Sequence, residues 1–341
     1  MSAWSSFGIG VLFALLVMPA FVYLFFKFFV WSVRRKLVGL VEDLQAVMDF
    51  STPLRIKLCA VAEPFPWLSE TKAQRICSEM KSLGFEDAGN FEVPELQSAS
   101  LKAFAWPQQS MYAYLCHHPA KEECFIDIIR VFEDGTSVTL SDVPDTGVDP
   151  CPAHRNLKRP GSTAADLVKE LRKASGKKKA LPASVAEAAT RYEKGYAAIM
   201  DWRVERGGVS EDELMAQADE DTTEEELAAA RVEFRMAHLL QLDELLRIRY
   251  EEKIGAVEWA LIEDQAVIVH DRLTPREVQQ MVKEAMPDLE EEVPLPKQSG
   301  RVGMNEIVKQ LPVKQEMTKH GDIPGTVEAD VYIFNPAGVR S

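Results

Sequence analysis

The sequence of 341 residues lacks the short motifs of the commonest nucleotide and metal enzymes. It contains no Walker phosphate loop, no glycine-rich dinucleotide fingerprint and no metal helix of the His-Glu-x-x-His type. It also lacks an internal repeat with the period of a solenoid or propeller. The sequence therefore assigns no catalytic residue and no cofactor.

Cysteine and basic charge are also scarce. The five cysteines are odd in number and irregularly spaced, which favours reduced thiols in a reducing compartment over a disulfide framework. The net charge of −14 argues against nucleic acid as a partner, because binding to phosphates requires a basic surface. The apolar fraction of 46% is that of a folded protein.

One long uncharged segment lies near the N-terminus. Residues Phe7 to Phe26 carry no charged side chain, and 20 helical residues span roughly 30 Å, the thickness of the hydrocarbon core of a bilayer. Lys27 and Trp31 follow in the positions of a snorkelling lysine and an interfacial aromatic residue. The segment has no basic region before it and is too long for a cleaved signal peptide. We therefore expect a single transmembrane helix.

The basic residues that follow this segment predict its orientation. Arg34, Arg35 and Lys36 lie on its C-terminal side, and no charged side chain precedes Phe7. The positive-inside rule then places the bulk of the chain in the cytoplasm, at the plasma or inner membrane. An apolar stripe beyond the membrane extends the helix to about residue 49, so that residues 1–49 form the anchor and a juxtamembrane helix.

The expected fold class is α+β. Residues 50–175 predict a strand at 54–60, a helix that ends at Gly84, an antiparallel meander of five strands and a further helix around Leu167. The meander strands are expected at residues 91–93, 101–106, 111–117, 124–132 and 136–141.

The rest of the chain predicts a second, mainly helical domain. A linker around residues 174–182 precedes helices over residues 183–289. Capping-box spacing marks their starts, and the pairs are Ser184 with Glu187, Ser210 with Glu213, Thr223 with Glu226, and Thr274 with Glu277. Residues 257–270 predict a small hairpin, with a continued helix as the alternative. Residues 290–341 predict a flexible tail, within which Val331 to Phe334 form a short strand or docking peptide.

Two chemical sites are conceivable around residues 116–154. Cys116, His117, Cys124, Cys151 and His154 are metal-capable, but their spacing matches no usual zinc module, so no metal is predicted. A nucleophilic cysteine needs a lowered pKa and a nearby base, and adjacency in sequence does not provide that geometry. Buried small side chains on strands are the simpler interpretation of Cys116 and Cys124.

Charge is strongly segregated along the chain. Residues 155–179 carry a net charge of +7, whereas residues 211–226 hold nine acids and no base. The simpler interpretation is solvated surface. The alternative is that the basic segment, with Lys177, Lys178 and Lys179, contacts anionic lipid near the anchor. The acidic segment then faces a basic protein partner or another copy of the chain.

These features favour a membrane-anchored interaction or scaffold protein that is not an enzyme. Its expected partners are the lipid bilayer, through the N-terminal helix, and a protein partner or a second copy of the chain. The alternative is a membrane-bound, hydrolase-like enzyme with its site around residues 116–154.

Overall fold

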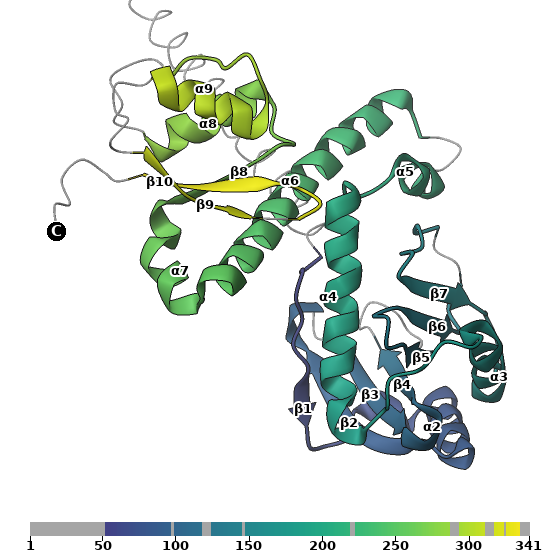
Figure 1. The fold of residues 1–341 in the computed structure, drawn as a ribbon. Helices are drawn as coiled ribbons and strands as arrows, with labels where there is room; N and C mark the ends of the chain where they lie inside the picture. The colour runs from purple at the N-terminus through teal and green to yellow at the C-terminus, as the bar shows by residue number, and fades with distance from the viewer. Residues whose placement is uncertain are drawn as a thin grey trace, which may run out of the picture. The chain divides into compact units, whose positions relative to one another are not determined.

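Alternating apolar segments joined by short turns form a seven-stranded sheet (Figure 1). The computed structural model describes residues 52–96, 99–117, 124–144, 147–218, 222–286, 293–310, 317–323 and 325–334. The strands are β1 Cys59–Val61, β2 Glu86–Val93, β3 Ala99–Trp106, β4 Met111–His117, β5 Phe125–Val131, β6 Ser137–Ser141 and β7 His154–Lys158.

The strands of this sheet lie in sequence order from β1 to β7. Successive strands from β1 to β6 pair antiparallel, whereas β7 pairs parallel to β6. The sheet is therefore mixed, and the α+β class expected from the sequence is confirmed. Strand β7 has no signal in the sequence, because its residues, His-Arg-Asn-Leu-Lys, lack the β-branched and aromatic residues typical of strands.

One face of the sheet is covered by α2, Thr71–Leu83, and α3, Ala164–Ser175. Both helices bury their apolar residues against strands β4, β5 and β6 in a single core. α2 ends at Gly84, whose φ of 99° lies in the left-handed region that glycine adopts without strain. The predicted C-terminal glycine of this helix is thus confirmed.

The opposite face is covered by α4, Ala188–Arg206. Ala183 and Ala188 share a core with Tyr112 and Tyr114 of β4, so the chain immediately after the expected linker packs on the sheet. Short 3₁₀ helices connect several elements and span Pro66–Ser69, Pro94–Leu96, Pro107–Gln109, Val185–Glu187 and Glu263–Gln265.

The C-terminal part of the chain combines helices with a small sheet. Its helices are α5 Glu211–Gln217, α6 Glu224–Ile254, α7 Ala256–Ile262, α8 Pro275–Ala285 and α9 Gly300–Gln310. The strands β8 Ala266–His270, β9 Met317–Ile323 and β10 Ala329–Phe334 form an antiparallel sheet in the order β8-β10-β9. The capping boxes predicted at Ser210, Thr223 and Thr274 form, whereas Ser184 makes no side-chain cap.

Three segments differ from the sequence-based expectations. The first strand begins at Cys59, and the alternating residues before it are buried without forming a ladder: Leu54 lies in the core of α4 and α6, and Ile56 and Leu58 lie in the core beneath α4. The expected hairpin at 257–270 is α7 followed by β8. In place of the flexible tail from residue 290, the described residues form α9, β9 and β10, because Met304, Ile307 and Tyr332 complete a core against α8.

Candidate functional site

The sheet carries a row of polar side chains on the face that α4 covers only in part. The register pairs Asp127 of β5 with Ser141 of β6, and Ser141 with Lys158 of β7. The next alternate positions pair Thr139 with Asn156, and then Ser137 with His154. Since alternate residues of a strand share a face, these positions form a polar ladder across three strands.

A cavity of about 340 Å³ lies between this polar ladder and α4. Asp127, Ser137, Thr139, His154 and Asn156 line its sheet side. The rest of the wall is mainly aromatic and aliphatic, and it includes Tyr112, Tyr114, Ile129, Val131, Leu181, Tyr192, Tyr196 and Ile199. The arrangement of a few polar groups in an apolar cleft is typical of sites for small molecules.

Hydrogen bonds fix the tyrosine wall of the cavity. Tyr114 donates its hydroxyl to the Ala188 carbonyl oxygen at 2.8 Å, and the Tyr112 hydroxyl accepts from the Ser184 backbone N–H at 3.1 Å. The Tyr196 hydroxyl donates to the Pro53 carbonyl oxygen at 2.7 Å. The rings of Tyr114 and Tyr192 lie 4.7 Å apart, tilted by 60°. These contacts hold the aromatic wall in place before any ligand binds.

A glycine in the middle of α4 leaves the cavity open. Gly195 lines the cavity, and a Cβ added there meets no atom within 4 Å. A glycine in the interior of a helix is less favourable than alanine by roughly 1 kcal/mol. No packing contact accounts for this glycine, and its effect is to widen the space beneath the helix.

The Asp127 carboxyl is the group in this cavity whose surroundings are most unusual. Its Oδ1 atom is buried and makes no hydrogen bond of ordinary geometry in the described part of the chain, and the hydroxyl of its register partner Ser141, which favours the charged carboxylate, is the nearest donor. Burial raises the pKa of this carboxyl above its ordinary value. A buried polar atom without a partner is costly, so a ligand that brings a hydrogen-bond donor to Oδ1 gains free energy there.

Ser137 and His154 form a pair at the other end of the ladder. The Ser137 hydroxyl lies 3.0 Å from Nδ1 of His154, and burial lowers the pKa of this imidazole. A serine hydrolase needs an acid that orients the histidine. Ser137 is paired with Val131 of β5, and Asp127 lies four residues before Val131 on the same strand. At the rise of a strand, four residues separate Asp127 from the position beside Ser137 by roughly 13 Å. Asp127 is therefore too distant to complete a triad.

The five side chains singled out between residues 116 and 154 do not converge. Cys116 faces α4 and lies 4.0 Å from the Tyr192 hydroxyl, whereas Cys124 lies in the core beneath α2 and α3. His117 stacks on Trp67, with ring centroids 5.2 Å apart. Cys151 is buried just before β7, and only His154 lines the cavity. Within the described ranges, no cluster of three His, Cys, Asp or Glu side chains is arranged to hold a metal.

The last three lysines of the basic segment, at residues 177–179, follow α3 and precede a bridge between Phe132 and Ala180. Lys178 forms an ion pair of 2.9 Å with Asp134, and Lys179 forms one of 2.7 Å with Glu133. The Thr136 hydroxyl and Lys178 together lower the pKa of Asp134 to about 2. Two of the three predicted lipid contacts are thus already paired with carboxylates.

The predicted anchor lies outside the described residues. Its residues are Phe7, Phe26, Lys27, Trp31, Arg34, Arg35 and Lys36. Among the residues that the structure describes, none of the helices combines the length and the apolar character needed to cross a bilayer.

Sequence reasoning missed Asp127, Gly195 and the polar ladder. A signal for the polar ladder was present in β6, whose residues Ser-Val-Thr-Leu-Ser alternate polar and apolar side chains.

Comparisons with protein-family models, with curated proteins and with solved structures find no match to this chain.

Proposed function

We propose that this chain is a membrane-anchored binding protein whose body takes up a small amphipathic molecule beneath α4. The observation that carries the proposal is the unpartnered Asp127 Oδ1 in a cavity of about 340 Å³ with a tyrosine wall. The anchor is the uncharged segment from Phe7 to Phe26, with Arg34, Arg35 and Lys36 on the cytoplasmic side. The anchor places the binding body at the inner surface of the cell membrane.

The chemistry of the cavity suggests the class of ligand. Tyr112, Tyr114 and Ile129 offer flat apolar surface for an aromatic or aliphatic body. Asp127 calls for a hydrogen-bond donor on that body, such as a hydroxyl, amide or amine. Arg191 and Lys194 of α4 also line the cavity and favour a ligand that carries a negative charge as well.

Binding of a fluorescent probe to the full-length chain in detergent tests this assignment. The probe is anilinonaphthalenesulfonate, which has an aromatic body, an N–H donor and a negative charge. We expect one saturable site in the wild type and in Gly195→Ala. Gly195→Trp fills the cavity from the same position, so we expect loss of that site with unchanged helix content. Equal binding by both variants contradicts the proposal.

The Ser137–His154 pair makes the hydrolase-like alternative directly testable. Their hydrogen bond of 3.0 Å is the observation in favour of an enzyme, and the distant Asp127 is the observation against it. We expect no hydrolysis of p-nitrophenyl acetate above the solvent rate. Hydrolysis that is lost in Ser137→Ala favours the enzyme over the binding protein.

The proposed partners follow from the anchor and from the charge pattern. The bilayer is one partner, and a basic protein or a second copy of the chain is the other, facing the acidic residues 211–226. We retain Lys177, Lys178 and Lys179 as lipid contacts. Lys178 and Lys179 form ion pairs with Asp134 and Glu133, which partly neutralise their charges. Lys177 therefore contributes most to the attraction to anionic lipid.

A further inference from the structure

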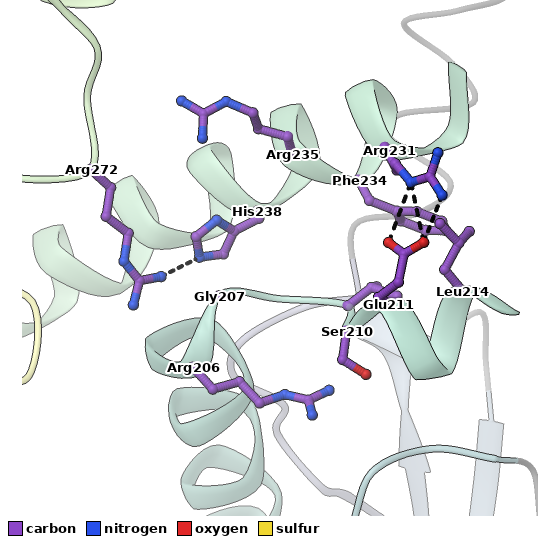
Figure 2. A pocket seen from close by; sticks show the side chains of 11 residues that line it. Arg206, Gly207, Ser210, Glu211, Leu214, Arg231, Phe234, Arg235, His238 and Arg272 are labelled. Atoms are coloured by element: carbon purple, nitrogen blue, oxygen red, sulfur yellow. Dashed lines mark hydrogen bonds and ion pairs between the residues drawn. The ribbon is translucent and has the colours of Figure 1, made fainter. Parts of the chain in front are cut away.

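A second cavity, of about 600 Å³, lies between the end of α4, the start of α5 and one face of α6. Four arginines line it, namely Arg206, Arg231, Arg235 and Arg272, together with His238 (Figure 2). The only carboxylate among its lining residues is Glu211. Such a concentration of arginine stands out in a chain whose net charge is −14.

The spacing of residues on α6 creates this basic wall. Arg231, Arg235 and His238 are separated by four and three residues, which places them on one face of the helix. Arg272, from the loop after β8, joins them, and its Nη1 lies 2.9 Å from Nε2 of His238. Gly208 allows this close packing, because its φ is +82° and a Cβ there would lie 3.0 Å from the Cβ of His238.

The four arginines are not equally available. Arg206 is held by Asp149 and Glu213, and Arg231 is held by Glu211 and Glu224 (Figure 2 shows the Arg231–Glu211 pair). Their positive charges are therefore largely neutralised by carboxylates that are already in contact.

Arg235 and Arg272 retain binding capacity. Arg235 uses only Nη2 in its ion pair with Glu277 and is half exposed. Arg272 donates to the carbonyl oxygens of Val204 and Glu205, and it forms no ion pair in the described part of the chain. Its charge is thus hydrogen-bonded but not neutralised. Figure 2 shows His238 between the side chains of Arg235 and Arg272.

The remaining lining residues define the other end of the cavity. Val209, Leu214 and Phe234 are apolar, and they share with Arg235 and Arg272 the lining of a space much larger than a single phosphate needs. Guanidinium forks match the oxygens of phosphate in pairs, whereas an aromatic ring matches an organic body.

We propose that this cavity binds a phosphate ester of an organic molecule, with the phosphate between Arg235 and Arg272 and the organic part against Phe234. The proposal is independent of the ligand assigned to the cavity beneath α4. The phosphate can belong to a soluble phosphate ester or to a lipid headgroup, since both present the same oxygens to the arginines.

Calorimetric titration of the full-length chain in detergent with phenyl phosphate and with inorganic phosphate tests the proposal. We expect one site per chain, with phenyl phosphate bound more tightly than inorganic phosphate. Arg235→Gln should weaken binding of phenyl phosphate about tenfold, because it removes a charge-assisted hydrogen bond. Arg235 is exposed and does not hold α4 in place, so this variant should fold normally.

Arg276→Gln is the matched control. Arg276 lies on α8, is exposed, does not line the cavity, and carries the same charge. We expect its affinity for phenyl phosphate to stay within about twofold of the wild type. Equal weakening by Arg235→Gln and Arg276→Gln, or the absence of a saturable site at low salt, overturns the proposal.

A competition arm identifies the source of the phosphate. The same titration is run in mixed micelles that contain phosphatidylcholine alone or phosphatidylcholine with phosphatidate. Loss of phenyl phosphate binding only in the phosphatidate micelles supports a lipid headgroup as the natural ligand. Unchanged binding in both supports a soluble phosphate ester.

Discussion

The Tyr114 hydroxyl donates a hydrogen bond of 2.8 Å to the carbonyl oxygen of Ala188, the first residue of α4. This bond joins the centre of the large sheet to the helix that covers the proposed binding cavity. Both partners are buried, so water does not replace the bond when it is lost.

Tyr114→Phe should lower the free energy of unfolding by about 1 kcal/mol, the typical contribution of one hydrogen bond. Urea unfolding followed by circular dichroism measures the change. Tyr192→Phe is the matched control, because the Tyr192 hydroxyl only contacts the Cys116 sulfur at 4.0 Å. We expect a smaller loss in that control, and equal losses would show that the Tyr114 bond has no special role.

Glu213 should make the stability of the chain depend on acid pH. The carboxylate is buried, which alone raises its pKa, but hydrogen bonds from Arg206 and from the backbone N–H groups of Ser210 and Asp149 outweigh burial and lower it. Since the folded pKa lies below the ordinary value of 4.5, the stabilisation is complete above pH 4.5 and is lost as pH falls through the folded pKa.

The variant Glu213→Gln tests this sign. At neutral pH we expect it to lower the free energy of unfolding by about 2 kcal/mol, because a charged hydrogen bond to Arg206 is lost. The difference from the wild type should shrink as pH falls below 4.5. Glu211→Gln, which removes an exposed ion pair with Arg231, should have little effect on stability at any pH. A difference at Glu213 that grows in acid contradicts the assignment.

Cysteine reactivity should separate the exposed thiol from the buried ones. Cys59 is exposed, Cys77 is partly buried, and Cys116, Cys124 and Cys151 are buried. Burial raises the pKa of the Cys77 thiol and raises that of Cys116 well above its ordinary value, so both should react more slowly than Cys59. Native protein should react rapidly with Ellman's reagent at one thiol, and Cys59→Ser should remove that phase. Rapid reaction of Cys116 in the folded chain would instead support the nucleophile considered in the sequence analysis.

The orientation of the anchor is open to a reporter experiment. Because Arg34, Arg35 and Lys36 follow the uncharged segment, a green fluorescent protein fused after Ser341 should be fluorescent. Alkaline phosphatase at the same position should be inactive, since it requires export. Replacing the three basic residues with Gln should weaken this preference. An active phosphatase fusion of the wild-type chain means that the orientation is reversed.

The sequence predicted elements whose signals are local. The helix from Thr71 to Leu83 has apolar residues on one face and a glycine after it. Capping boxes form at three of the four predicted places where serine or threonine precedes glutamate by three residues. Strands β3 to β6 have apolar alternate residues and clear turns between them. In these elements local propensity and tertiary packing agree.

Features that depend on distant contacts were not predictable. β7 is polar and becomes a strand because it pairs with β6. The short strand considered at Val331 to Phe334 is part of β10, but its pairing with β8 and β9, from separate parts of the chain, has no local signal. Leu54 and Ile56 have the alternation of a strand, yet they are buried in two different cores. The candidate site shares this limit, because Asp127 and Gly195 meet only through the packing of α4 on the sheet.

The described chain begins with three contacts along α4, and these contacts have a mechanical consequence. The Pro53 carbonyl oxygen accepts from Tyr196, Arg55 pairs with Asp201, and the Leu58 N–H donates to Glu193. A pulling force on the chain before Pro53 therefore reaches α4 through three side chains that share the load. Tyr196 also forms part of the cavity wall. A force applied before Pro53 and occupancy of the cavity thus act on the same helix.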